Sequence, residues 1–329
     1  MRIFVTGGNG FVGQHLITRL LNDGHQLNLL VRSKNQHNIP PNKNLNFFEG
    51  DILDYYSLKK AIDGCQQVYH LAACTSIWVK DPKQYYLVNV IGTNNVLEAA
   101  LDANVDKIVV TSTAGVFGPS IDGEITESSP RLIDYFNEYE SSKAISESMI
   151  KNYVLEKKMN VIIVNPTRIY GPHINTPIGS FTQMIYRYNI GKWRLIPGDG
   201  TKIGNYIYID DVIEGHLKAM EKGVKGKNYL LSGENFSYND FFKELKITSK
   251  KDYRLFHIPI FIQMIYGRMQ ELKRILFSSK PTITPKWIKR GNYNWEVSNE
   301  RIQEELGVNI TSLKDGLQKT IYWLNNRNY

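Results

Sequence analysis

The sequence of 329 residues predicts an α/β fold, in which a doubly wound parallel sheet is followed by a smaller C-terminal lobe. Three observations predict it. Short apolar segments rich in β-branched residues alternate with longer segments of helical spacing through the first two-thirds of the chain. The strand-like segments are apolar without interruption, which is typical of strands covered by helices on both faces. After Pro166 the alternation gives way to stretches rich in Gly and Pro, which indicates a second lobe.

The expected strands and helices follow one another in β-α-β order. Strands are predicted at residues 3–5, 27–31, 67–70, 107–111 and 161–164, with helices at 12–22, 57–63, 84–103 and 141–157. A further strand at 206–209 precedes a helix at 212–222 that Asp211 is expected to cap, and a last helix covers 313–325. Right-handed connections then wind the sheet in both directions. We therefore expect one domain at 1–170, with 206–226 returning to it, and a substrate-binding lobe at 171–329.

A glycine-rich turn, Thr6-Gly7-Gly8-Asn9-Gly10-Phe11-Val12-Gly13, connects the first strand to the first helix. Gly7 permits a tight turn, Gly10 lets the backbone approach a pyrophosphate, and Gly13 lets helix and strand pack closely. The helix N-terminus presents unpaired N–H groups to an anion. This context predicts a Rossmann-type dinucleotide site, and a purely structural turn is the simpler alternative. Its expected contacts are Gly7, Gly10, Phe11, Val12 and Gly13.

The residue that ends the second strand of such a domain selects the cofactor. An acidic residue there would bind the ribose 2′-hydroxyl of NAD, but this chain has Arg32, Ser33 and Lys34. A guanidinium can stack on adenine and pair with a 2′-phosphate. We therefore favour NADP(H), with NAD(H) as the alternative and with solvated loop charges as the non-functional interpretation.

Tyr139 and Lys143 are four residues apart, on one face of a predicted helix. A nearby ammonium is expected to lower the pKa of the phenol, so that Tyr139 exchanges a proton with a carbonyl or alcohol oxygen. Thr111, Ser112 and Thr113 end a strand at the sheet edge where ligands of such sheets bind. Thr113 could hold the substrate oxygen against Tyr139. Taken alone, the Tyr139/Lys143 spacing also fits a pair on the protein surface. Hydroxyl groups at strand ends, taken alone, often only cap turns.

Together these residues resemble the extended short-chain dehydrogenase/reductase family, also called the NAD-dependent epimerase/dehydratase family. The resemblance covers essentially the whole chain and rests on ordered matches: the glycine-rich turn, Gly50-Asp51-Ile52, His70-Leu71-Ala72-Ala73, Asn89-Val90-Ile91-Gly92-Thr93, the Thr113 segment, Tyr139/Lys143 and Asn165-Pro166-Thr167. It implies catalytic Thr113, Tyr139 and Lys143, and a homodimer. The cofactor contacts that it implies, besides those of the turn, are Asp51, Ile52, Leu71, Ala72, Ala73, Asn89, Thr111, Ser112, Tyr139, Lys143, Pro166, Thr167, Arg168 and Ile169.

Two positions depart from the nucleotide-sugar enzymes of this family. Their usual Asn before the YGP-like motif is Arg168 here, and the Arg that grips a diphosphate is Gly204. The chain is more similar to the dihydroflavonol-reductase-like branch. We therefore expect an enzyme that reduces a ketone or aldehyde with NADP(H), and keep two alternatives: a nucleotide-sugar epimerase or dehydratase, and a non-catalytic NADP-binding sensor. The expected substrate contacts are Cys74, Thr75, Ser76, Thr113 and Arg168.

The remaining composition excludes several classes of protein. The histidines show no metal-ligand spacing, so no metal site is expected, and His70 is interpreted as a core residue. Two cysteines, no signal peptide and no apolar run long enough to span a bilayer indicate a cytoplasmic protein. The net charge of +8 does not predict nucleic-acid binding, because no nucleic-acid-binding motif accompanies it.

Residues 246–290 hold eleven Lys and Arg against Asp252 and Glu271, a local balance of +9. Within this segment, residues 258–277 have the spacing of an amphipathic helix, with apolar positions 258, 262, 265, 269, 272 and 276 opposite Gly267, Gln270, Glu271 and Arg274. We expect its apolar face to pack on the protein's own substrate lobe. The alternative is a lid at the pocket mouth that contacts an anionic membrane.

Overall fold

The computed structural model of the chain describes residues 1–33, 39–173, 180–277 and 279–326. Its centre is a parallel seven-stranded sheet in the order β10-β6-β5-β4-β1-β2-β3. The strands are β1 (Arg2–Thr6), β2 (Gln26–Val31), β3 (Leu45–Glu49), β4 (Gln67–His70), β5 (Lys107–Thr111), β6 (Val161–Pro166) and β10 (Asn228–Leu231). The strand order reverses between β1 and β4, so the predicted doubly wound Rossmann-type sheet is confirmed.

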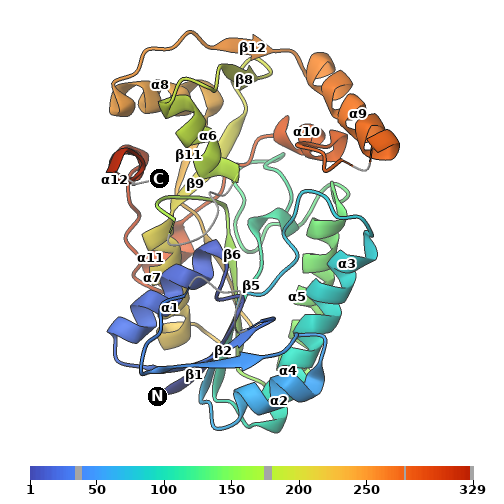
Figure 1. Cartoon of the computed structure of the whole chain (residues 1–329), viewed down its shortest axis with the longest axis vertical. Helices are drawn as coiled ribbons and strands as arrows, with labels where there is room; N and C mark the ends of the chain where they lie inside the picture. The colour runs from blue at the N-terminus through green and yellow to red at the C-terminus, as the bar shows by residue number, and fades with distance from the viewer. Residues whose placement is uncertain (34–38, 174–179, 278, 327–329) are drawn as a thin grey trace.

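Helices cover both faces of this sheet (Figure 1). One face packs on α1 (Phe11–Asn22) and α7 (Ile209–Lys222), and the other on α2 (Tyr55–Ile62), α4 (Gly92–Asp102) and α5 (Glu138–Glu156). Alternate residues of one strand serve different layers: Val5 belongs to the first apolar cluster and Phe4 to the second. Because both faces are buried, the strands need apolar residues at consecutive positions, which is the pattern that predicted them.

The predicted helix at 84–103 is a helix of mixed hydrogen-bonding pattern. It begins as α3 (Lys83–Tyr86), continues through a π-helical segment η1 (Leu87–Ile91) and ends as α4. Such π segments occur frequently at functional sites. Asn89 lies in this one, and its amide contacts the backbone of Cys74 in the loop after β4.

Most of the remaining elements form the smaller part of the structure, drawn in the upper part of Figure 1. A three-stranded sheet joins β7 (Arg168–Tyr170), β9 (Ile203–Tyr208) and β11 (Glu234–Ser237), and β8 (Leu195–Pro197) pairs with β12 (Phe256–Ile258). The helices of this part are α6 (Ser180–Asn189), α8 (Tyr238–Ser249), α9 (Ile260–Phe277), α10 (Pro285–Gly291) and α12 (Leu313–Asn326). Two short elements contact the main sheet instead: the 3-10 turn η2 (Ala114–Val116) beside β6 and α11 (Glu300–Glu304) beside β10.

Three local expectations are corrected. The strand predicted at 206–209 does not join the main sheet, since β9 pairs with β7 and β11, although α7 after it does pack on the main sheet. Instead β10, beyond the expected return at 206–226, extends the main sheet beside β6. Asp211 does not cap α7. Its carboxylate accepts hydrogen bonds from the backbone N–H and the hydroxyl of Thr311, at 2.8 and 2.6 Å. The lobe boundary at residue 170 stays a prediction.

The close contact between α1 and the glycine-rich turn generates the first prediction. A Cβ on Gly13 would lie 2.3 Å from the carbonyl oxygen of Gly7, so Gly13→Ala must push the helix from the turn. We expect it to destabilise the protein by roughly 1–3 kcal/mol and to weaken dinucleotide binding, measured by urea unfolding and by titration with NADPH. Gly291→Ala is the matched control, because its new Cβ would meet only the Tyr238 hydroxyl, at 3.8 Å. Equal unfolding midpoints for the two variants would contradict this account.

Candidate active site

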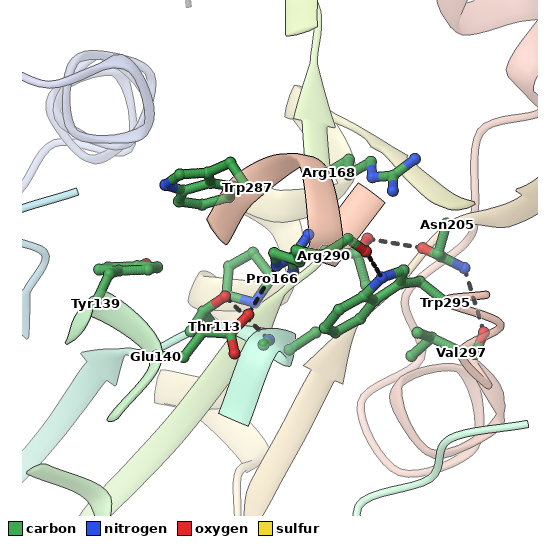
Figure 2. A pocket seen from close by; sticks show the side chains of 13 residues that line it. Thr113, Tyr139, Glu140, Pro166, Arg168, Asn205, Trp287, Arg290, Trp295 and Val297 are labelled. Atoms are coloured by element: carbon green, nitrogen blue, oxygen red, sulfur yellow. Dashed lines mark hydrogen bonds and ion pairs between the residues drawn. The ribbon is translucent and has the colours of Figure 1, made fainter. Parts of the chain in front are cut away.

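The predicted catalytic residues Thr113 and Tyr139 line one pocket at the carboxyl edge of the main sheet (Figure 2). Thr113 follows β5 and caps η2, because its hydroxyl accepts the N–H of Gly115 at 3.1 Å. Tyr139 lies in the first turn of α5, whose N-cap Asn137 accepts the N–H of Glu140 at 3.0 Å. These two capping hydrogen bonds fix the backbone at the start of η2, beside Thr113, and at the start of α5, beside Tyr139.

The protonation of Tyr139 differs from the expectation. Burial raises the pKa of its phenol to about 12, against a smaller lowering by its hydrogen bond with Thr113 and by the charge of Arg290. The expected lowering by Lys143 is not among these effects. The loss of water around the phenolate outweighs the nearby positive charges, so Tyr139 is protonated at neutral pH. The Tyr139 phenol therefore holds a proton that it could donate.

Lys143 is fully buried one helical turn from Tyr139. Its Nζ donates a hydrogen bond to the carbonyl oxygen of Thr111 at 2.8 Å, which places the ammonium at the end of β5. Burial lowers the pKa of Lys143 to about 8, and the charge of Glu147 raises it by less. Glu147 is itself held by the side-chain amides of Asn165 and Asn228, at 2.6 and 2.9 Å. Lys143 can therefore gain or lose a proton close to neutral pH.

A buried carboxylate beside Tyr139 joins the two parts of the structure. Glu140 is 1% exposed and forms ion pairs with Arg131 at 2.9 Å and with Arg290 at 2.7 Å. Its Oε2 also accepts the N–H of Phe136. Arg290, from the end of α10, lies over the ring of Trp295 at 3.8 Å. Through Glu140, the helix that carries Tyr139 is tied to residues 150 positions further along the chain.

The opposite wall of the pocket comes from the C-terminal part of the chain, which sequence reasoning missed. The pocket has a volume of about 180 Å³ and its wall from this part consists of Trp287, Arg290, Trp295 and Val297. The indole N–H of Trp287 donates to the carbonyl oxygen of Ile77 at 3.1 Å, so α10 also contacts the loop after β4. The sequence held no local signal for these residues, because they reach the pocket only through long-range packing.

Arg168 and Gly204, the two positions that depart from nucleotide-sugar enzymes, are in contact. Arg168 lines the pocket, and its guanidinium would lie 2.0 Å from a Cβ placed on Gly204. Its Nη1 is 3.2 Å from the hydroxyl of Tyr206, and the guanidinium lies over the rings of Tyr206 and Tyr238. No Asp or Glu of the described ranges forms an ion pair with it. A cation is therefore present beside Gly204, but it projects from β7 instead of β9.

The glycine-rich turn fits the pyrophosphate of a dinucleotide. Gly7 has a φ of +74°, and a Cβ there would lie 2.5 Å from the backbone nitrogen of Ala72. The N-cap of α1 is Gly10, whose lack of a side chain leaves the helix N-terminus without a side-chain cap, and the first turn holds no acidic residue. The N–H groups beside Phe11, Val12 and Gly13 are thus those that would hold the phosphates. The positive φ of Gly7 and the close packing at Gly13 agree with their predicted conformational roles, and the approach of a pyrophosphate to Gly10 stays a prediction.

Other predicted cofactor contacts are positioned around the same edge. The Asp51 carboxylate accepts the N–H of Leu53 at 2.9 Å, and Ile52 is buried. Ala72 donates its N–H to the Thr6 hydroxyl at 3.2 Å, between partly buried Leu71 and Ala73. Arg32 is exposed at the end of β2 beside Ser33, and Lys34 lies outside the described residues.

The remaining predicted cofactor contacts lie near the predicted catalytic residues, where some line the pocket and others hold the neighbouring backbone in place. Pro166, Thr167 and Arg168 line the pocket, and the partly buried Ile169 continues β7. The side-chain amide of Asn89 accepts the N–H of Cys74 and donates to the Ser142 hydroxyl, so Asn89 positions the loop after β4. The buried hydroxyl of Ser112 has no hydrogen-bond partner among the described residues, whereas that of Thr111 is 2.8 Å from His216 Nε2.

Cys74, Thr75 and Ser76, the expected substrate contacts after β4, are not among the residues that line this pocket. Their contact with substrate stays a prediction.

His70 is buried between the hydroxyls of Thr6 and Thr93, at 2.7 and 3.0 Å, which agrees with its interpretation as a core residue. Burial lowers the pKa of His70 to about 3. Within the described ranges, no cluster of three or more His, Cys, Asp or Glu could hold a metal ion.

Comparison with known proteins agrees with this architecture. The model of the NAD dependent epimerase/dehydratase family matches residues 3–232. Human dTDP-D-glucose 4,6-dehydratase is 33% identical over 71% of this chain and 69% of its own length. Sterol demethylase protein B of Methylococcus capsulatus is 29% identical over 99% of both chains. The crystal structure of gox2253 superposes with a TM-score of 0.81 at 28% identity, covering 98% of this chain and 97% of that one.

The ion-pair network around Glu140 generates the second prediction. Glu140→Ala leaves Arg131 and Arg290 buried without their common carboxylate, and we expect a loss of about 3–5 kcal/mol in the free energy of unfolding. Urea unfolding, monitored by circular dichroism, measures this loss. Glu138→Ala, two residues away, removes only the exposed pair with Lys286 and should cost no more than about 1 kcal/mol. A loss no larger for Glu140→Ala than for Glu138→Ala would contradict the structural role of the network.

Proposed function

The chain belongs to the NAD-dependent epimerase/dehydratase family and is an NAD(P)-dependent enzyme, and within this family we propose that it reduces a ketone or aldehyde with NADP(H). The observation that carries the proposal is the composition of the pocket. Protonated Tyr139 and the Thr113 hydroxyl form one wall, and the indoles of Trp287 and Trp295 form the other. A polar pair facing an aromatic wall suits a carbonyl on an apolar or ring-bearing substrate.

The state of Tyr139 supports the direction of reduction. When bound, the nicotinamide supplies a hydride to the carbonyl carbon. The Thr113 hydroxyl holds the carbonyl oxygen, and the Tyr139 phenol gives its proton to that oxygen as negative charge develops. A phenol with a pKa of about 12 carries this proton throughout the neutral range. Lys143, with a pKa of about 8, lies one turn along α5 and can supply positive charge beside the reacting groups.

The sequence similarity is compatible with an apolar substrate. Sterol demethylase protein B, which aligns over 99% of its length, is named for a sterol, whereas the human dTDP-D-glucose 4,6-dehydratase aligns over 69% of its length. The indoles of Trp287 and Trp295 and the ring of Pro166 offer stacking and apolar contact to a substrate, beside the polar side chains of Thr167, Arg168 and Asn205.

One observation favours a second candidate, a nucleotide-sugar epimerase or dehydratase. One of the two departures that argue against it is the missing Arg at position 204, but the guanidinium of Arg168 lies against Gly204. A cation without a carboxylate partner could pair with a phosphate of the substrate. The two functions differ in their net use of cofactor, because epimerisation regenerates it within each turnover.

The NADP(H) preference generates the third prediction. Arg32 is the exposed cation at the end of β2, where an acidic residue would bind NAD. Arg32→Glu should raise KM for NADPH by about tenfold or more, since it replaces a phosphate-binding charge with a repelling one. KM for NADH serves as the internal control and should stay the same or fall. Equal changes for the two cofactors would refute the assignment of Arg32.

The catalytic assignment generates the fourth prediction. Tyr139→Phe removes the proton donor and retains the ring, so kcat for carbonyl reduction should fall by about 100-fold to 10,000-fold while NADPH still binds. The decrease in NADPH absorbance with a panel of ketones and aldehydes measures kcat, and fluorescence titration measures binding.

The same assay separates the two candidate functions. Consumption of NADPH by the wild type with a carbonyl substrate supports reduction. Conversion of a nucleotide-sugar without net change in NADPH absorbance would replace it with the second candidate. Unchanged turnover in Tyr139→Phe would refute the role of Tyr139 in either reaction.

A further inference from the structure

Helix α9 is oriented opposite to the expectation from its sequence. The face that contacts the protein is small and polar: Gly267 is its one buried residue, and a Cβ there would lie 2.7 Å from Ile288 of α10. On the same side, the amide of Gln263 donates to the carbonyl oxygen of Ile258, and the Arg274 guanidinium lies over the Trp78 ring. The expectation that the apolar face packs on the lobe is therefore wrong, because the tight contact at Gly267 fixes the helix the other way.

The apolar face of α9 is open to solvent. Its large apolar side chains are 45–75% exposed: Ile260, Phe261, Ile262, Ile265, Tyr266, Met269, Leu272, Ile275, Leu276 and Phe277. We call this set the α9 face. The helix lies at the edge of the molecule, with α10 on its inner side (Figure 1). A contiguous apolar surface along 18 residues is rare on a protein that works alone in water.

Positive charges accompany the α9 face. Arg268 and Lys273 are exposed on the same helix, and Lys280 follows it. In the described part of the chain no acidic side chain forms an ion pair with any of the three, whereas Lys246, Lys286 and Arg290 are paired with Asp252, Glu138 and Glu140. Glu271, the one acidic residue of the helix, is half-buried. The solvent-facing side of α9 is thus both apolar and cationic.

We propose that the α9 face binds the surface of an anionic membrane. Its apolar side chains would lie at the boundary between headgroups and acyl chains, and Arg268, Lys273 and Lys280 would contact lipid phosphates. A second copy of the chain fits less well, because a twofold contact through this face brings the same cations together. None of the described helices combines the length and apolarity needed to cross a membrane, so the contact is with one surface.

Docking through α9 also brings the active site close to the lipid. Gly267 packs on α10, and α10 contributes Trp287 and Arg290 to the pocket. The indole of Trp287 further bonds the loop after β4 at Ile77. Helix α10 therefore lies between the membrane-facing helix and the pocket, with one side against α9 and the other forming part of the pocket wall.

Vesicle sedimentation tests the proposal independently of enzyme activity. The protein should sediment with vesicles of equal parts phosphatidylglycerol and phosphatidylcholine at low salt, and much less with phosphatidylcholine alone or at high salt. Leu276→Glu places a negative charge on the α9 face and should weaken binding by about tenfold or more. Arg268→Gln and Lys273→Gln should weaken it about fivefold each.

Leu155→Glu is the matched control, because Leu155 on α5 is 66% exposed and Leu276 is 63% exposed. It should bind vesicles like the wild type, and thermal unfolding should show that both variants are folded. Wild-type protein that stays in the supernatant with anionic vesicles at low salt would overturn the proposal. A wild-type dimer that Leu276→Glu converts to a monomer in lipid-free solution would overturn it too, since the face would then belong to a second copy.

Discussion

The arrangement of the active site depends on a single buried carboxylate with two guanidinium partners. Glu140 follows Tyr139 on α5 and binds Arg131 from the preceding loop and Arg290 from α10. Charges removed from water are stable only when paired, so each partner restricts the position of the other two. The result is that the phenol and the C-terminal wall of the pocket keep a fixed separation, although they belong to distant parts of the chain.

Burial also decides how the predicted catalytic groups, Tyr139 and Lys143, are protonated. Sequence spacing alone suggests that Lys143 makes Tyr139 more acidic, but the ammonium is directed to the Thr111 carbonyl and the pKa of the phenol rises. Desolvation penalises both charged forms, raising the pKa of Tyr139 and lowering that of Lys143. The two pKa values are thereby moved apart, to about 12 for the phenol and about 8 for the ammonium, so the phenol keeps its proton at a pH where the ammonium can lose one.

The sequence predicted the parts of the fold that local pattern encodes. Apolar runs identified β4 and β5 to the residue, and glycine spacing identified the dinucleotide turn. Strands with mixed burial, such as β3, and strands placed by distant pairing, such as β10, gave no such pattern. For α9, periodicity predicted the helix but not which face is covered, because a single close contact at Gly267 outweighs the apolar stripe.

The same limitation applies to the inference drawn from Gly204. The sequence shows which strand carries a charged side chain. A ligand, however, binds the charged group itself, wherever the side chain places it in the structure. Arg168 projects across the pairing between β7 and β9, where it is in register with Tyr206, and its guanidinium takes the space that Gly204 leaves open. The absence of one arginine from a motif therefore does not remove the cation. What distinguishes this pocket is the aromatic wall of Trp287 and Trp295, since a charge alone fits a phosphate and a carboxylate equally well.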